Sequence, residues 1–204
     1  KIVSSLARPG GNITGLAVLV QEVGPKRLQL LKEILPRTSQ VARLYSIAGV
    51  TDLQPVIIEE YNVVARAQRI ALQHVPLTEA KDLDAALGAA AASRIDAVIL
   101  EADAIFAVNR ASVAALALKH RLPLMCADGR FVEAGALAAY SEIFAARYRR
   151  AAFFVDKILR GAKPADLPIE QPVRFDLVIN LKTAATLGLA FPPALLTTAD
   201  EVIE

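Results

Sequence analysis

Short apolar runs alternate along the chain with longer segments in which apolar residues recur every three or four positions. The short runs have few polar positions and are bounded by polar or turn residues. Runs of this kind are typical of strands covered on both faces, as in a parallel sheet. The sequence therefore predicts five strands, at Val41–Ile47, Ile95–Leu100, Leu122–Cys126, Ala136–Tyr140 and Asp176–Asn180.

Helical spacing marks five further segments. In Pro25–Leu35, Leu28, Leu31 and Leu35 form one apolar stripe, and the charged residues lie elsewhere. The other predicted helices are Gln54–Ala71, Asp82–Ser93, Ala107–His120 and Phe144–Leu159. This alternation of strands and helices predicts an α/β fold with right-handed crossovers and a mostly parallel sheet.

Composition narrows the class of protein. The 204 residues are 54% hydrophobic, and 23 basic against 21 acidic residues give a formal net charge of 23 − 21 = +2. Such a chain is expected to fold, and its small charge does not indicate a nucleic-acid partner. No apolar stretch approaches the roughly 18 residues of a membrane-spanning helix, and the N-terminal residues KIVSSLARPGGN lack a signal-peptide pattern.

Residue types suited to catalysis or metal binding are scarce. The single cysteine, Cys126, excludes an internal disulfide. The two histidines, His74 and His120, are few ligands for a transition-metal site. The glycines of Arg8–Gly15 (RPGGNITG) favour a turn over a phosphate-binding loop, which needs a strand before it and a helix after it. No serine lies in a G-x-S-x-G elbow, and no nucleophile is paired with a base. The sequence thus predicts no catalytic residue, no metal and no cofactor.

Polar residues stand at the ends of several predicted strands, where open α/β sheets bind ligands. Tyr45–Ser46, Asp128–Arg130 and Tyr140–Ser141 are ordinary loops one by one, but together they would surround a single crevice. We interpret them as candidate ligand contacts.

Three carboxylates, Asp96, Glu101 and Asp103, cluster around the strand Ile95–Leu100. For Asp103 two interpretations stay open, a ligand contact at the strand end and an N-terminal cap of the next helix. A structural role is preferred for Asp96. Cys126 lies in an apolar strand and is expected to be a buried, unreactive thiol.

Several stretches resemble a known family. They are RPGGNITGL, GPKRLQLLKEILPRTSQVA and RLPLMCADGRFVEAGALAAYSE, together with the C-terminal stretch from AAFFVDKILRGAKPADLPIEQ to the last residue. These segments resemble ABC-transporter substrate-binding proteins, of the type associated with aromatic amino acids or uncharacterised ligands. The resemblance covers essentially the whole chain and is most specific at its C-terminal end.

The resemblance implies a type I periplasmic-binding fold, with two doubly wound α/β lobes and a ligand in the cleft between them. On this pattern residues 1–16 and 121–170 form part of lobe one, and residues 17–120 and 171–204 form lobe two. Lobe one would be incomplete, because such proteins normally carry most of it, after a signal sequence, in a preceding segment.

Two expectations follow from this lobe assignment. The strands within Val41–Leu100 and Phe175–Asn180 should share one sheet, and Leu122–Cys126 and Ala136–Tyr140 should lie in another. The incomplete lobe should expose apolar surface, so the isolated chain should self-associate or hold its missing part as a separate chain. Ligand affinity of the chain alone should then be weak.

The resemblance also implies ligand contacts, because four loops match ligand loops of the family. The family's Tyr-Asn-Pro reads Tyr-Ser-Ile here, Ala102 replaces a proline, and Ser141 replaces a glycine. The residues that match are Tyr45, Ser46, Asp103, Phe106, Asp128, Arg130, Tyr140 and Ser141.

The function implied by the resemblance is that of a solute receptor of an ABC import system, in the periplasm or associated with the cell envelope. It would bind a small molecule, with an amino acid or aromatic compound as candidates, and deliver it to membrane permease subunits. Two alternatives stay open. One is a ligand-sensing regulatory domain of the same fold. The other, favoured less, is an α/β enzyme using the same cleft.

Overall fold

The computed structural model describes residues 3–18, 20–47 and 54–204. The chain divides into two compact units, and each unit combines segments that are far apart in the sequence. Unit 1 consists of Lys1–Leu19 and Glu142–Phe175, and unit 2 of Val20–Ser141 and Asp176–Glu204. The chain therefore passes from one unit to the other three times.

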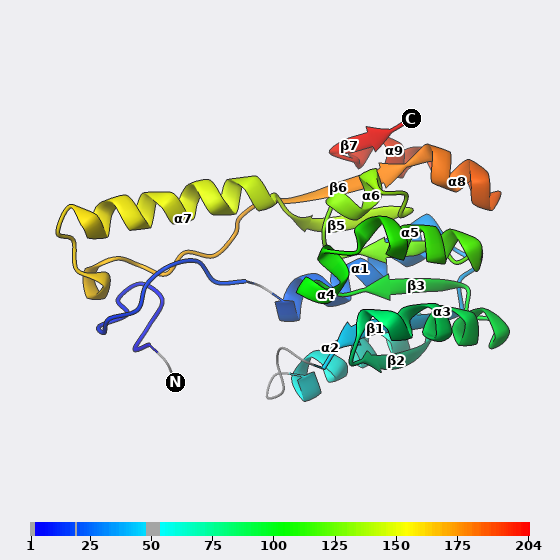
Figure 1. Ribbon diagram of the computed structural model, residues 1–204, viewed down its shortest axis with the longest axis horizontal. Coiled ribbons are helices and arrows are strands. Elements are labelled where there is room, and N and C mark those ends of the chain that lie inside the picture. Colours follow the sequence, from blue (N-terminus) through cyan, green and yellow to red (C-terminus); the bar gives the residue numbers. More distant parts are fainter. Residues whose placement is uncertain (1–2, 19, 48–53) are drawn as a thin grey trace. The chain divides into compact units, whose positions relative to one another are not determined.

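Unit 2 is built on a sheet of seven strands in the order β2-β1-β3-β4-β5-β6-β7 (Figure 1). The pairs β1–β2, β1–β3, β3–β4, β4–β5 and β6–β7 are parallel. The carboxyl ends of β1, β3, β4 and β5 consequently lie along one edge of the sheet, called here the carboxyl edge. The strands are β1 (Gln40–Ser46), β2 (Ala71–Leu77), β3 (Ala97–Leu100), β4 (Leu124–Cys126), β5 (Ala138–Glu142), β6 (Phe175–Asn180) and β7 (Glu201–Ile203).

Helices cover both faces of this sheet, as the alternating side chains of β3 show. Ala97 and Ile99 belong to the apolar cluster that contains residues of α1 (Val20–Ile34) and α2 (Gln54–Ala67). Val98 and Leu100 belong to a second cluster, with residues of α3 (Leu83–Ala92) and α5 (Arg110–Lys119). Successive strand side chains point to opposite faces, so a strand packed on both faces must be apolar throughout. The other helices of unit 2 are α4 (Ala104–Ala107), α6 (Arg130–Glu133), α8 (Leu181–Leu187), α9 (Pro193–Thr198) and the 3-10 turn η1 (Ala80–Asp82).

Unit 1 contains the long helix α7 (Phe144–Leu159), the 3-10 turn η2 (Pro164–Asp166) and extended backbone. Leu16 and Glu170 form a parallel bridge, and the amide of Ala17 donates a 2.8 Å hydrogen bond to the carbonyl of Glu170. Arg150 of α7 forms an ion pair with the Glu170 carboxylate, which ties the helix to this extended segment.

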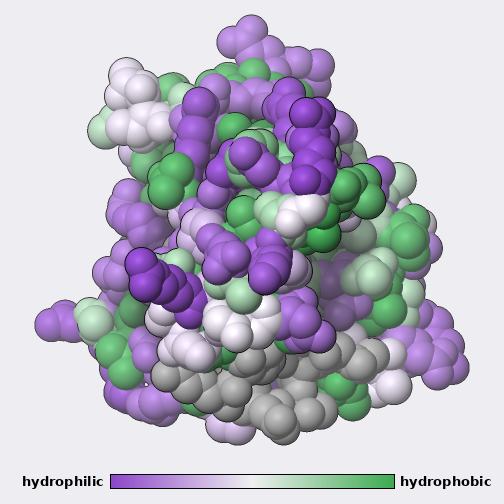
Figure 2. Space-filling view, turned by 90° about the vertical axis from the view of Figure 1, so that its left-hand side faces the viewer, coloured by the Kyte–Doolittle hydropathy of each residue, from purple (hydrophilic) through white to green (hydrophobic). Residues whose placement is uncertain are grey.

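Apolar side chains remain exposed on α7. Val155 and Leu159, one helical turn apart, are 55% and 82% exposed. Apolar side chains also reach the surface as green areas among purple ones on the face of the molecule in Figure 2. Among the described residues, no helix is both long and apolar enough to cross a membrane.

The predicted elements are confirmed in position, with shifts at their ends. The helix predicted at Ala107–His120 is α5 and begins later, at Arg110, while Asp103 caps the separate short helix α4 before it. The predicted helix Gln54–Ala71 ends at Ala67, and the chain enters β2 at Ala71. The turn predicted at Arg8–Gly15 is supported by positive φ angles at Gly10 and Gly15.

Two edge strands, β2 and β7, were not predicted from the apolar pattern. β2 (ALQHVPL) is half-exposed and carries Pro76, which an edge strand tolerates because its outer N–H groups need no partner. β7 has only three residues, and two of them are exposed. Neither strand needs the apolar run that reveals a central strand.

The prediction of two separate sheets is wrong. β4 pairs with β3 through Val98 and Leu124, and with β5 through Met125 and Ala138, so all five predicted strands share one sheet. Residues 121–141, expected in lobe one, lie in unit 2, and the chain crosses between the units at Glu142, the last residue of β5. The run LMC fits any sheet covered on both faces, because pairing partners are chosen by long-range packing.

Candidate ligand-binding site

The carboxyl edge begins at the end of β1 with Tyr45, which is half-buried, and Ser46, which is buried. The guanidinium carbon of Arg43 lies 4.7 Å from the ring centroids of both Tyr45 and Tyr61. A cation over an aromatic face is attracted by the ring. Arg43 therefore helps to hold the Tyr45 ring in place.

After β3 the chain passes through Asp103 and Phe106. Asp103 is half-buried, and its Oδ1 accepts a 2.8 Å hydrogen bond from the amide of Ile105, as the N-terminal cap of α4. The capping interpretation is thus confirmed. Capping uses only Oδ1, so a ligand contact through the other carboxylate oxygen stays a proposal. The side chain of Phe106 is fully buried in the core, where it supports this loop.

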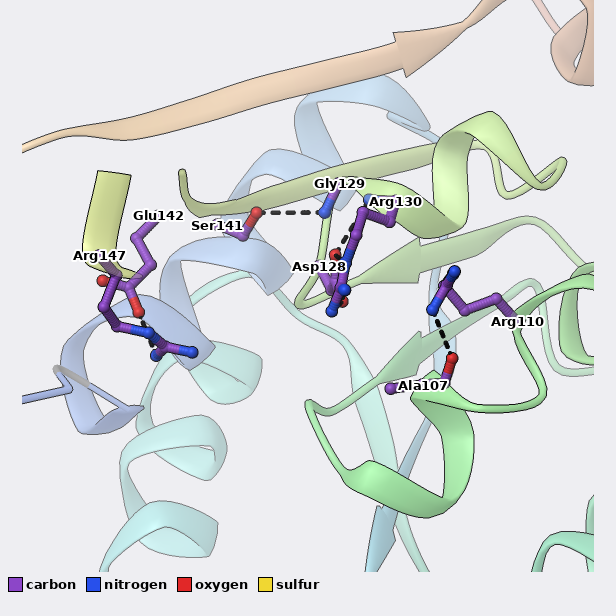
Figure 3. Close-up of polar contacts among 8 residues, drawn as sticks. All are labelled: Ala107, Arg110, Asp128, Gly129, Arg130, Ser141, Glu142 and Arg147. Carbon is purple, nitrogen blue, oxygen red and sulfur yellow. Dashed lines mark hydrogen bonds and ion pairs between the residues drawn. The ribbon is translucent and has the colours of Figure 1, made fainter. Parts of the chain in front are cut away.

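A polar contact joins the loop after β4 to strand β5 (Figure 3). Asp128 accepts hydrogen bonds from Arg130 Nη2 at 2.6 Å and from Arg130 Nε at 3.0 Å. The Ser141 Oγ accepts a 3.2 Å hydrogen bond from the amide of Gly129. Tyr140, half-buried, offers its carbonyl to Arg27 Nε at 2.9 Å. The polar residues at these two strand ends are consequently fixed relative to each other.

All eight predicted contact residues lie in unit 2, either within the later residues of β1 and β5 or in the segments that follow β3 and β4. Direct contacts join Asp128 to Arg130 and connect Ser141 to the same loop. Phe106 differs from the others because it packs entirely within the core.

A buried polar cluster underlies this edge, and the sequence did not predict it. Its centre is Glu101, directly after β3. Glu101 Oε2 accepts from Arg27 Nη1 at 3.0 Å, and Oε1 accepts from Arg43 Nε at 2.9 Å and from the Tyr61 hydroxyl at 2.6 Å. The cluster joins α1, β1, α2 and β3, and its bond from Arg27 to Tyr140 reaches β5. We call Arg27, Arg43, Tyr61 and Glu101 the Glu101 cluster.

The charges in this cluster are set by burial and by the two arginines. Burial alone would raise the pKa of Glu101, but Arg27, Arg43 and the Tyr61 hydrogen bond outweigh it and hold that pKa below its usual range. Burial, and then the negative charge of Glu101, raise the pKa of Tyr61. Glu101 is therefore ionised and Tyr61 neutral at pH 7.

His74 of β2 lies beside the cluster. Its Nδ1 is 3.4 Å from Arg43 Nη1, and its Nε2 is 3.1 Å from Asn62 Oδ1. Burial, and then the positive charge of Arg43, lower the pKa of His74, so the ring is neutral in the folded protein at pH 7.

We expect His74 to make folding stability fall between pH 7.5 and pH 5. The folded pKa lies below the unfolded one, so the unfolded chain takes up its proton first and is favoured as the pH falls. The effect should stay below about 1 kcal/mol, because His74 is half-exposed and solvent screens its charge. Urea unfolding at both pH values should show a smaller loss for His74→Gln than for the unaltered chain. Equal losses would contradict this assignment.

Two other residues have structural roles, as predicted. Asp96 Oδ2 accepts hydrogen bonds from the amides of Ser39 and Gln40, at 2.7 and 2.9 Å. Cys126 is fully buried in β4, and burial raises the pKa of its thiol. Within the described ranges, no three His, Cys, Asp or Glu side chains are grouped to hold a metal ion.

One sequence signal could have indicated the Glu101 cluster. Arg43 is the one charged residue inside the apolar run Val41–Ile47, and a strand buried on both faces can hold a charge only with a partner. Glu101 was recognised as a strand-end carboxylate. Arg27 gave no signal, because it stands among other charged residues of an amphipathic helix.

Comparison with known proteins places these features in a family. Residues 1–203 match the family model described as ABC transporter substrate binding protein. A curated relative, the tyrosine-binding protein of Clostridioides difficile, is 20% identical over 188 residues, which are 92% of this chain and 53% of the relative. The chain thus spans about half the length of that relative.

Two solved structures are similar to nearly the whole chain. A conserved domain protein from Vibrio cholerae has a TM-score of 0.86 and 28% identity, over 98% of this chain and 66% of that one. An ABC domain from Streptococcus pneumoniae in complex with L-Trp has a TM-score of 0.85 and 25% identity, over 98% of this chain and 68% of that one. The α/β fold is therefore that of type I periplasmic-binding proteins, as expected. The chain belongs to the ABC transporter substrate binding protein family.

Proposed function

We propose that this chain forms the ligand-binding part of a solute receptor of an ABC import system. The match of residues 1–203 to the substrate-binding family carries this proposal. The receptor works outside the cytoplasm, in the periplasm or at the cell envelope, and delivers its ligand to membrane permease subunits. It acts by binding and not by catalysis.

An aromatic amino acid is the ligand class best supported. One relative is named for tyrosine binding, and one similar structure contains L-Trp. At the carboxyl edge, Tyr45 offers a half-buried ring, and aromatic rings pack favourably against one another. Asp103, Asp128 and Arg130 offer charged groups for the ammonium and carboxylate of an amino acid.

The family match favours a receptor over the two alternatives. A regulatory domain of this fold would sense the same kind of ligand, but the family is defined by transport proteins. An enzyme would need a nucleophile or a general base at the carboxyl edge. The single thiol of the chain, Cys126, is buried with a raised pKa, which opposes its use as a nucleophile.

The proposal is tested by calorimetric titration of the chain with L-tryptophan, L-tyrosine and L-leucine. We expect the aromatic amino acids to bind measurably and more tightly than L-leucine. Tyr45→Ala should weaken aromatic binding by about 1 kcal/mol, roughly fivefold in Kd, through loss of ring contact. Tyr148→Ala is the matched control, because Tyr148 is an exposed tyrosine on α7 of unit 1. Absence of binding to either aromatic amino acid, or equal loss in both variants, would contradict the proposal.

A further inference from the structure

We propose that Arg27 is a specificity-determining residue, whose guanidinium draws a negatively charged group of the ligand to the carboxyl edge of unit 2. This inference rests on the proposed function as a solute receptor and assigns part of its selectivity to one buried side chain. Arg27 was not among the predicted contact residues.

The first argument is the charge of the Glu101 cluster. It contains two guanidinium groups, from Arg27 and Arg43, and one carboxylate, from Glu101. The neighbouring Tyr61 hydroxyl and His74 ring are neutral at pH 7, as derived above. The cluster therefore carries one positive charge more than negative, although Arg27, Arg43 and Glu101 are 6%, 1% and 9% exposed.

The other charged groups at this edge do not balance that excess. Asp128 forms its ion pair with Arg130, so this pair is neutral as a whole. Asp103 keeps its negative charge, but the hydrogen bond of its Oδ1 is to the amide of Ile105 at the start of α4 and not to Arg27. Buried charges are normally paired, because a low-dielectric interior screens them weakly. An anion arriving at this edge would thus be attracted more strongly here than at an ordinary surface.

The second argument is the geometry of the Arg27 side chain. Nε donates to the carbonyl of Tyr140 and Nη1 donates to Glu101. Among the described residues, Nη2 donates to no acceptor, and a guanidinium has five N–H donors in a fixed fork. Of the two acceptors that hold the side chain, Glu101 directly follows β3 and Tyr140 lies within β5. The unused donors of Arg27 are therefore held at the edge where the ligand is expected.

Arg43 does not compete for this role. Its guanidinium is 1% exposed and lies over the rings of Tyr45 and Tyr61, and it contacts Glu101 and His74. Its charge is matched locally by Glu101. Arg43 Nη2 also has no acceptor among the described residues, but the Arg43 guanidinium lies against two aromatic rings and is the less exposed of the two, so we assign the surplus charge to Arg27.

The ligands that fit are amino acids and other small molecules with a free carboxylate. An amide of the same molecule keeps its shape and its ammonium group but loses the negative charge. Arginine recognises carboxylates by short, charge-assisted hydrogen bonds that a neutral amide forms less strongly. We therefore expect the receptor to discriminate between an acid and its amide.

The test compares the Kd of L-tryptophan with that of L-tryptophanamide, or of L-tyrosine with L-tyrosinamide, by calorimetry. The unaltered chain should bind the acid about tenfold or more tightly than the amide. Arg27→Met should weaken acid binding about tenfold and change amide binding less than about twofold, so the preference disappears. Arg27→Lys, which keeps the charge, should retain part of the preference. Arg66→Met is the matched control, because Arg66 pairs with Glu59 on the exposed face of α2.

The outcomes separate this inference from the proposed function. If neither the acids nor the amides bind the unaltered chain, the receptor function itself fails. If acid and amide bind it equally well, or if Arg27→Met weakens both alike, the receptor function stands and the role of Arg27 is overturned. Should Arg27→Met not fold, the acid-to-amide ratio in the unaltered chain and in Arg27→Lys decides the question. If Arg27→Lys also loses the preference for the acid over the amide, the geometry of the guanidinium, and not its charge, determines that preference. This result would overturn the inference as stated.

Discussion

Replacing Glu101 by Gln is expected to lower the free energy of unfolding by about 3–5 kcal/mol, the usual cost of removing one partner of a buried ion pair. Glu101 accepts hydrogen bonds from Arg27, Arg43 and Tyr61 at a position that is only 9% exposed. The amide would leave two buried guanidinium groups without a counter-charge. The loss should exceed that of Arg27→Met, which leaves the balanced pair of Glu101 and Arg43.

The measurement is urea unfolding at pH 7 followed by circular dichroism. Glu59→Gln is the matched control, because Glu59 pairs with Arg66 where both side chains are exposed. Such exposed pairs contribute little to stability. A similarly small loss of unfolding free energy in both glutamate variants would show that the Glu101 cluster does not stabilise this edge of the sheet.

The Glu101 cluster should also influence stability in acid. The pKa of Glu101 is lower in the folded chain than in the unfolded chain. Its contribution is therefore complete above the unfolded pKa of about 4.3 and is lost as the pH falls through the folded pKa. Glu101→Gln should remove this part of the acid dependence.

Self-association of the isolated chain through unit 1 is the second large effect that we expect. On α7, Val155 and Leu159 are one turn apart and exposed to 55% and 82%, so their side chains are apolar neighbours on one exposed face of the helix. Phe153 is more protected, because Arg150 lies 4.0 Å and Lys157 5.5 Å from its ring centroid. Soluble monomers rarely leave such surface uncovered unless it binds a partner.

A cavity in the same unit adds to this expectation. It has a volume of about 360 Å³ and is lined by residues 16–17, by the first turns of α7 and by residues 170–174. The similar solved structures are longer than this chain, which covers 66–68% of them. We therefore expect the apolar surface of unit 1 to be covered by another polypeptide, and in a pure preparation by a second copy.

Size-exclusion chromatography with light scattering tests this expectation. The unaltered chain should form dimers or larger species whose fraction rises with concentration. Val155→Glu combined with Leu159→Glu should shift the population to the monomer, because burying two carboxylates in an apolar contact is costly. Val63→Glu serves as the control, since Val63 is 50% exposed on α2 of unit 2. A monomer at every concentration in the unaltered chain would refute the self-association.

Much of the local structure could be predicted because it depends on residues close in sequence. The five apolar runs became β1, β3, β4, β5 and β6, and the stripe over 144–159 became α7 with the same limits. Asp103 was placed at a strand end and capped a helix, since a cap needs only the next turn of chain. The edge strand β2 was not predicted, because polar residues interrupt its apolar pattern.

The grouping of these elements was decided only by the tertiary structure. The apolar run of β4 satisfies any doubly covered sheet, and its pairing with β3 and β5 placed residues 121–141 in unit 2. The candidate site shows the same division. The sequence by itself was enough to predict polar residues near the carboxyl ends of parallel strands, because that position follows from strand direction. It could not bring Arg27 to Glu101, 74 positions away, because a buried ion pair forms only where packing removes water from both partners.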